Sequence, residues 1–227
     1  MKKIAIFISI VILFFSSLIS LAEEKDYNNI QISEEKIYLN LDYIEIDINI
    51  PVIEELQNII LEEKINSLMK YELTNFAYNQ QQEAKDLSKD LKENLNKTQF
   101  NYKASNTFEI FSTDNFISIL IAYYQYTGGA HGLYWYKSYI INHLQEELVE
   151  LDDILTKENS KEIILKEINK QIKANTDDYF VESVDYFNEE NFYLTEKGIV
   201  FYYTLYELGP YVMGIPEFLI PWDSMEN

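Results

Sequence analysis

The segment Tyr123–Gly132, YYQYTGGAHG, decides how the middle of this chain folds. Two runs flank it, FISILIAYYQYT over 116–127 and YWYKSYIIN over 134–142, both rich in β-branched and aromatic side chains that favour a pleated sheet. The segment holds three of the six glycines and one of the two histidines: Gly128, Gly129, Gly132 and His131. Because glycine adopts positive φ at little steric cost, a Gly-Gly pair between two such runs predicts a β-hairpin turn.

The other three glycines and three of the four prolines lie in a second segment, Phe192–Trp222. It reads FYLTEKGIVFYYTLYELGPYVMGIPEFLIPW. Glycine and proline at this density determine the backbone conformation before they contribute to any ligand site. We therefore expect a shaped loop that leads into a final strand, Glu217–Trp222, with Gly209, Pro210 and Gly214 as its turn residues. Alternatively, Tyr206 and Glu207 line a groove beside the first hairpin.

These two segments carry a resemblance. The patterns YxYTGGAHG and FxLTxxGIVFYYxxYELGPYxxGxxEFxIPW resemble bacterial extracytoplasmic domains of unknown function. Such domains occur at the N-terminus of the peptidoglycan deacetylase PdaC and in the lysozyme-recognising ectodomain of the anti-sigma factor RsiV. The resemblance implies a cell-envelope setting, a PdaC N-terminal-like domain over 33–145 and an RsiV C-terminal-like domain over 146–223. It implies no catalytic mechanism, because the deacetylase activity belongs to a separate domain.

Composition narrows the possible functions. At 227 residues, 47% of them apolar, the chain can bury a core in one or two compact units. It has no cysteine, which excludes disulfides, thiolate metal ligands and a thiol nucleophile. Acidic residues outnumber basic ones by 38 to 18, every basic residue is lysine, and the net charge is −20. This charge argues against nucleic acid as a ligand. It favours a basic partner, or serves only solubility.

Residues 1–22 have the pattern of a secretory signal peptide. Two lysines precede an apolar run from Ile4 to Phe15, and small residues ending at Ala22 mark a cleavage position. We therefore expect an exported protein, periplasmic or extracellular after cleavage near Ala22. An uncleaved membrane anchor is the alternative, since Ile4 to Leu21 approaches a span of about 20 residues. No cytoplasmic segment precedes the apolar run, so direct sigma-factor regulation is not expected.

The first half of the chain predicts strands followed by a long helix. Lys36–Ile50 alternates apolar and polar residues but changes phase near Tyr43, which indicates two short strands or one bulged strand ended by Pro51. From Val52 to about Leu95 the apolar spacing becomes helical. One unbroken helix of that length would exceed the width of such a domain, so we expect a break near 79–82, where three glutamines follow an asparagine.

The remaining elements complete an α+β pattern. Thr98–Phe111 reads as strands with a tight turn at Ser105-Asn106. The runs 116–127 and 199–206 are apolar in both phases, as in central strands. Leu151–Ala174 reads as one amphipathic helix. The sequence therefore predicts antiparallel sheets, a long N-terminal helical segment and a second helix, in two closely packed subdomains divided near residues 144 to 150.

An enzyme is not expected. His131 and His143 lie 12 positions apart, about 35 to 40 Å along an extended strand, so they cannot share a metal without a sharp bend. No HExxH, GxSxG or GxxxxGK[ST] motif occurs. Among 38 carboxylates an acid/base pair such as Glu207 with Asp185 can always be chosen, so that choice carries little weight. We expect no metal and no cofactor; an uncharacterised envelope hydrolase is kept as a second alternative.

Two binding hypotheses remain. The first is a secreted or periplasmic protein that captures a basic protein such as lysozyme, as the resemblance implies, with carboxylates steering the encounter and aromatics as anchors. The second is a module for peptidoglycan glycan, with aromatic faces stacked on sugar rings. For most of the 19 tyrosines, packing in the core and the sheets is the favoured explanation. The candidate binding residues are Tyr124, Tyr126, His131, Tyr134, Trp135, Tyr206, Glu207 and Tyr211.

Overall fold

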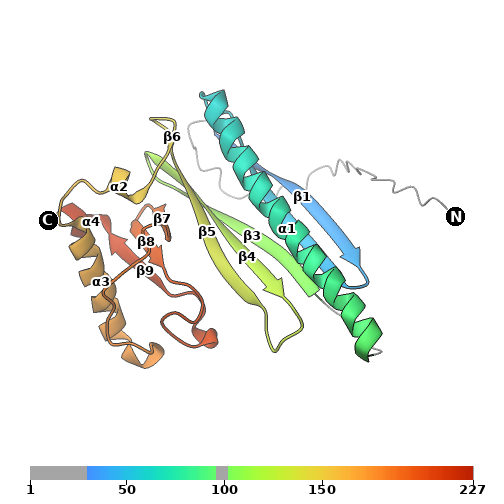
Figure 1. Cartoon of the computed structure of the whole chain (residues 1–227). Helices are drawn as coiled ribbons and strands as arrows, with labels where there is room; N and C mark the ends of the chain where they lie inside the picture. The colour runs from blue at the N-terminus through green and yellow to red at the C-terminus, as the bar shows by residue number, and fades with distance from the viewer. Residues whose placement is uncertain (1–29, 96–101, 227) are drawn as a thin grey trace, which may run out of the picture.

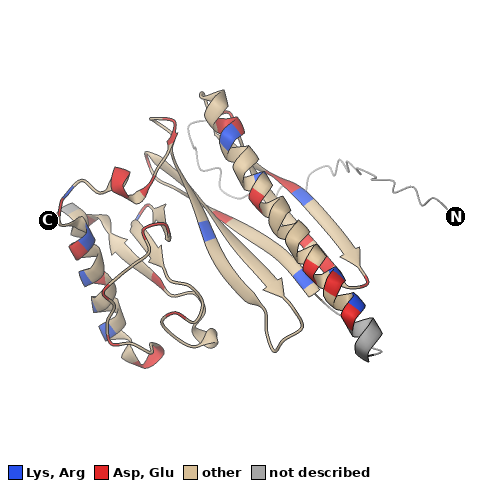
Figure 2. Cartoon of the chain, in the orientation of Figure 1, with Lys and Arg blue, Asp and Glu red and all other residues tan. Residues whose placement is uncertain are grey.

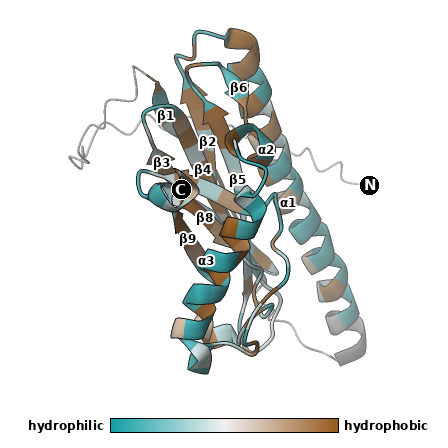
Figure 3. Cartoon of the chain, turned by 90° about the vertical axis from the view of Figure 1, so that its left-hand side faces the viewer, coloured by the Kyte–Doolittle hydropathy of each residue, from teal (hydrophilic) through white to brown (hydrophobic). Residues whose placement is uncertain are grey.

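The computed structural model describes residues 30–95 and 102–226. A six-stranded sheet lies between a long helix, α1 (Ile59–Leu95), and a three-stranded sheet, whose far side packs on helix α3 (Ser160–Ala174) (Figure 1). In Figure 3 the hydrophobic strands (brown) lie between α1 and α3, and both helices carry many hydrophilic residues (teal). The predicted α+β class is therefore confirmed.

The predicted signal peptide, with its cleavage position at Ala22, lies outside the described residues. So do the first residues of the strand predicted to begin at Thr98. Within 30–95 and 102–226, no helix combines the length and the apolar character needed to span a membrane.

The six-stranded sheet follows chain order from β1 to β6. All neighbouring strands are antiparallel except β2 and β3, which pair in parallel, so the sheet is mixed, whereas the sequence predicted antiparallel pairing throughout. The parallel pair arises because α1 connects β2 to β3 as a crossover. The strands are β1 (Gln31–Leu41), β2 (Ile44–Glu54), β3 (Tyr102–Ser112), β4 (Phe116–Tyr126), β5 (Leu133–Asn142) and β6 (Glu147–Leu148).

The phase change near Tyr43 marks a hairpin between β1 and β2, which confirms the two-strand alternative. The prediction that Pro51 ends the strand is wrong: β2 continues to Glu54, and Pro51 is paired opposite Glu34. Pairing between β2 and β3 stops at Asp47. Beyond that point one side of β2 has no partner strand among residues 30–95 and 102–226, and a proline, which has no N–H to donate, is tolerated at such an edge.

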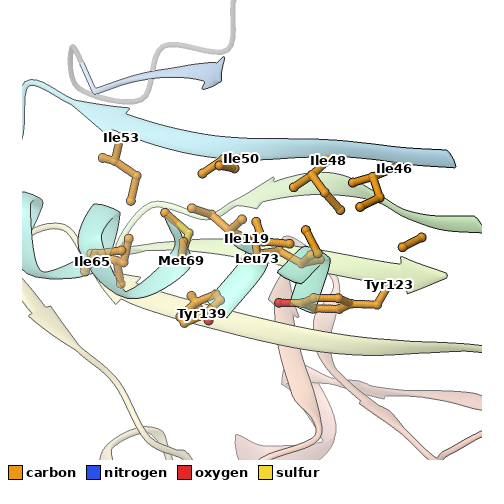
Figure 4. Close-up of a cluster of buried hydrophobic side chains, with 14 of the residues drawn as sticks. Ile46, Ile48, Ile50, Ile53, Ile65, Met69, Leu73, Ile119, Tyr123 and Tyr139 are labelled. Carbon is orange, nitrogen blue, oxygen red and sulfur yellow. The ribbon is translucent and has the colours of Figure 1, made fainter. Parts of the chain in front are cut away.

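Helix α1 is a single element of 37 residues, so the predicted break at 79–82 is wrong. Glutamine is among the better helix formers, and the glutamine run therefore continues the helix. The buried face also continues past this point, through Ala77 and Ala84. Residues 52–54, predicted as helix, belong to β2. Figure 4 shows how isoleucines of β2 meet one face of α1. Fully or almost fully buried members of this core include Ile46, Ile48, Ile50, Ile65, Met69 and Leu73.

Strand β3 runs unbroken through Ser105 and Asn106, so the predicted tight turn there is wrong. Asn106 is 2% exposed. Its side-chain amide donates to the Asn49 carbonyl at 2.7 Å, and its side-chain oxygen accepts from the Asn49 backbone N–H at 2.9 Å. These bonds lie just past the last β2–β3 ladder pair, Asp47 with Ser105. The asparagine side chain thus satisfies backbone groups of β2 where the ladder ends.

The second unit holds the three-stranded sheet, in the order β7, β8, β9. The helix predicted over 151–174 is two helices, because residues 155–159 leave helical geometry between α2 and α3. Of the isoleucines that helical spacing predicts as the core stripe, Ile164, Ile168 and Ile172 of α3 are buried, whereas Ile163 is only partly buried. The elements are α2 (Leu151–Ile154), η1 (Thr176–Asp178), β7 (Phe192–Thr195), β8 (Gly198–Tyr202), η2 (Tyr211–Met213), β9 (Glu217–Pro221) and α4 (Trp222–Glu226).

Two serines join the sheets. Ser118 on β4 is fully buried, and its hydroxyl accepts from the Leu194 N–H at 2.9 Å. Ser138 on β5 donates to the Phe192 carbonyl at 2.5 Å. Both bonds go to β7, whose one strand partner in the described part of the chain is β8. The open edge of β7 is therefore satisfied by the first sheet, and this fixes how the two units sit together.

Candidate docking surface at the junction of the two glycine-rich segments

The β4–β5 hairpin turns at residues 127–132, as predicted from its glycines. Gly128 has φ of 90°, a conformation that favours glycine. The Tyr126 hydroxyl donates to the Gly129 carbonyl at 2.8 Å and so braces the turn. Gly132 is buried under the Tyr124 ring, and a Cβ at this position would collide with that ring. Tyr124 and Tyr126 thus shape the hairpin.

The loop between β8 and β9, residues 203–216, is held by Glu207. Its carboxylate accepts from the Thr204 N–H at 2.6 Å, from the Thr204 hydroxyl at 2.7 Å and from the Tyr186 hydroxyl at 2.8 Å. Gly214 has φ of 82°, and Pro210 leads into η2. Glu207 therefore organises this loop.

The tips of the hairpin and of this loop meet. The Tyr206 hydroxyl lies 2.8 Å from His131 Nε2, across 75 residues of sequence. The Tyr211 ring stacks on the His131 ring with centroids 3.7 Å apart. Tyr134 meets Tyr211 edge-on at 5.9 Å. The two glycine-rich segments thus form one surface, in which Tyr206 lies beside the first hairpin.

The hydrogen bonds of His131 define its tautomer. Its Nδ1 lies 3.0 Å from the Gly132 carbonyl, which can only accept, so Nδ1 carries a proton. In the neutral ring Nε2 is then the acceptor, and the Tyr206 hydroxyl donates to it. Both ring nitrogens are engaged in contacts that hold the junction.

The predicted site residues divide into three groups. His131, Tyr134, Tyr206 and Tyr211 come together at the junction. Tyr124, Tyr126 and Glu207 support the two loops from within. Trp135 lies apart from the junction, because successive strand residues face opposite sides of a sheet. Its ring is stacked on Tyr123 at 5.2 Å and contacts Phe76 of α1 edge-on at 5.5 Å.

The structure adds one apolar residue that the sequence reasoning missed. Val212 is 90% exposed at η2, in the same loop as Tyr206, which is 46% exposed. The uncharged run LGPYVMGIP over 208–216 was the available signal, since it places an apolar side chain in a loop. We define the docking patch as His131, Tyr134, Tyr206, Tyr211 and Val212.

The docking patch is an uncharged area on a strongly acidic molecule. Neither 127–136 nor 208–216 contains a charged residue, while the whole chain has a net charge of −20. Glu207 follows Tyr206 directly, and its carboxylate is bonded to Thr204 and Tyr186. In Figure 2 the hairpin tip and the η2 loop are tan, and acidic residues recur along α1 and α3 and in other loops. Large exposed apolar groups gathered in this way mark interaction sites more often than isolated ones do.

Within the described ranges, no three His, Cys, Asp or Glu side chains are grouped so that they could hold a metal ion. His131 and His143 lie beyond opposite ends of β5, in keeping with their separation in the sequence.

Comparison with known families matches the chain in two places. Residues 37–134 match the family described as Deacetylase PdaC, and residues 152–223 match the Protein of unknown function family DUF3298. The chain resembles both families in turn. This confirms the expected likeness to PdaC-type domains of unknown function. The docking patch takes His131 and Tyr134 from the first match, and Tyr206, Tyr211 and Val212 from the second.

Two solved structures of the DUF3298 family share the fold. One, from Bacteroides fragilis, is 20% identical with a TM-score of 0.70, and the match covers 88% of this chain and 93% of that one. Another, from Pseudomonas aeruginosa, is 14% identical with a TM-score of 0.59, covering 87% and 92%. At these identities the likeness concerns the fold alone. Comparison with curated proteins gave no match.

Proposed function

We propose that this protein is a non-catalytic binding protein of the cell envelope that captures a basic protein, such as lysozyme, through the docking patch. The observation that carries the proposal is the convergence of the two glycine-rich segments into one exposed, uncharged aromatic surface. The export expected from residues 1–22 and the likeness to PdaC-type domains support the envelope setting.

The composition of the docking patch fits the centre of a protein interface. Interface centres are depleted in charge and enriched in tyrosine, while the surrounding charges steer the encounter. Here three tyrosines and one aliphatic side chain, Val212, lie on a molecule whose charge of −20 attracts a basic partner.

Backbone strain at Tyr206 supports the same assignment. Its φ of 70° is left-handed, which costs a residue other than glycine about 1–3 kcal/mol. Strain of this kind is retained where the surrounding structure holds it, and it gathers at binding sites. In this conformation the hydroxyl reaches His131 while the ring stays 46% exposed.

Calorimetric titration with lysozyme, at low salt and at 0.15 M salt, tests the proposal. A second small protein of similar basic charge serves as the control partner. Because exposed charges are screened beyond about 8 Å at 0.15 M salt, attraction by charge alone weakens there for both partners. The proposal expects lysozyme to remain bound in preference to the control.

A matched pair of variants separates apolar docking from charge. Val212→Asp adds a carboxylate to the docking patch, and Ile60→Asp makes the same change at an 80% exposed position on α1. Both raise the attraction for a basic partner by charge. The proposal expects Val212→Asp to weaken lysozyme binding by at least about tenfold, as at a hot spot, and Ile60→Asp to leave it unchanged or slightly tighter. Equal binding of lysozyme and the control protein, lost at 0.15 M salt, would contradict the proposal. If lysozyme did not bind at all, lysozyme would be excluded as the partner and peptidoglycan fragments would be tested next.

A further inference from the structure

A concave site, separate from the docking patch, lies between the two units. It is a cleft of about 810 Å³, with a volume in the range that holds a drug-sized ligand. One wall is the middle of α1, the floor is β5, and the opposite wall is formed by residues 149–152 and 189–192. In Figure 1, β5 runs between α1 and α2. The cleft contains no residue of the docking patch.

Aromatic side chains line part of this cleft. Trp135 and Phe76 meet edge-on with ring centres 5.5 Å apart, and the Tyr123 ring stacks on the Trp135 ring. Tyr136 and Tyr202 form another edge-on pair at 5.5 Å on the side of the second unit. The sequence placed Trp135 in the hairpin site. In the structure its partly exposed ring lines the cleft instead. Indole and phenol faces are the groups that attract cations best.

The charges of the lining are one-sided. Lys137 is its one basic residue, against five acidic residues: Glu72, Glu150, Asp152, Glu189 and Glu190. Two lysines of the protein already show how an ammonium group is held here. Lys137 lies 2.6 Å from Glu72 and 5.4 Å from the centre of the Tyr139 ring, and Lys161 bridges Glu189 at 2.8 Å and Asp152 at 3.2 Å.

Two carboxylates of the cleft have no lysine partner among the described residues, namely Glu150 and Glu190. The neutral amide and hydroxyl side chains of the lining, besides its tyrosines, are Asn75, Ser138 and Asn191, and the Ser138 hydroxyl is already bonded to the Phe192 carbonyl. A neutral sugar would use the carboxylates only as hydrogen-bond acceptors and would leave their negative charges without a counter-charge. A cationic ligand with an apolar stem meets both the rings and the carboxylates.

We propose that this cleft binds a short, extended peptide segment that carries lysine or arginine side chains. The aliphatic stems lie against Phe76 and Trp135, and the cationic ends reach Glu150 and Glu190. This site is separate from the docking patch, so either proposal can fail while the other stands.

Calorimetric titration of the whole protein with the capped tripeptide acetyl-Lys-Lys-Lys-amide, at 0.15 M salt, tests the inference. The neutral probe acetyl-Gln-Gln-Gln-amide and an uncharged chitooligosaccharide are titrated in parallel. The lysine peptide is expected to bind in preference to both. Equal binding of the two peptides, or preference for the oligosaccharide, would overturn the cationic assignment, and the second result would point to a glycan site.

Two matched pairs of variants locate the binding. Glu190→Gln is expected to weaken the lysine peptide about two- to fivefold, the range of one partly screened ion pair, whereas Glu182→Gln makes the same charge change at an exposed position outside the lining. Asn75→Phe fills the cleft from α1 and is expected to abolish binding, whereas Asn79→Phe, one turn further on, is not. Equal effects within either pair would overturn the assignment to this cleft.

Discussion

Asn106 is the buried polar residue whose removal the structure predicts to be most costly. Asn106→Ala deletes the two side-chain bonds to the Asn49 backbone, at 2.7 and 2.9 Å, without changing the apolar core of α1. It also removes the constraint that continues the β2–β3 contact beyond Asp47 and Ser105. The backbone N–H and carbonyl of Asn49 then lose their partners in a part-buried position.

The expected loss follows from those two groups. A hydrogen bond contributes about 0.5–1.5 kcal/mol net, and a buried group left unsatisfied costs about 1–3 kcal/mol. Because Asn49 is only partly buried, water satisfies part of the hydrogen bonding of its backbone N–H and carbonyl in the variant. We therefore expect Asn106→Ala to lower the free energy of unfolding by about 2–4 kcal/mol.

Urea unfolding followed by circular dichroism measures this loss, provided that the slope with denaturant stays constant. Asn40→Ala is the matched control: it makes the same change at an exposed position of β1 and should alter stability by less than about 0.5 kcal/mol. If Asn106→Ala behaved like Asn40→Ala, the assignment of β3 as an unbroken strand tied to β2 by this side chain would be refuted.

Three further results are expected. A double-mutant cycle of His131→Ala with Tyr206→Phe, measured by urea unfolding, should give a coupling energy of about 0.5–1.5 kcal/mol; additive effects would mean that the two tips do not touch. Burial raises the pKa of Tyr136 to about 12. The stability that this shift contributes to the folded state is therefore fully present below pH 10 and is lost between pH 10 and 12. Across that window Tyr136→Phe should lose less stability than the parent chain. Gly198→Ala should cost about 2 kcal/mol or more, because its Cβ would collide with a β9 carbonyl. Gly129→Ala should be nearly neutral in thermal unfolding, because its Cβ would meet the His131 carbonyl oxygen at an ordinary contact distance of 3.8 Å.

Local patterns predicted most elements because alternation and helical spacing follow directly from burial. The isoleucines of β2 and the apolar rows of α1 and α3 are of this kind. The errors arose where a residue type has two uses. Asn106 resembles a turn residue in sequence, but its side chain here satisfies backbone groups of β2. The glutamines near residue 80 look like a loose linker, yet they are helix formers on a continuous buried face.

The candidate site was only partly accessible to sequence reasoning. Alternation along β5 alone separates Tyr134 from Trp135, since neighbours in a strand face opposite sides. The contact between His131 and Tyr206 joins residues 75 positions apart, and no local period encodes such a pairing. Val212 was missed because exposure in an irregular loop follows from how the loop packs, which periodicity does not report.

Hydrogen exchange of the protein with and without lysozyme, read by mass spectrometry, tests the central claim most directly. If the two glycine-rich segments form one docking surface, binding slows exchange in both 127–133 and 204–214, and leaves the exposed face of α1 unchanged. Slowing in one segment alone, in neither, or chiefly along α1 would contradict a docking surface formed jointly by the two segments.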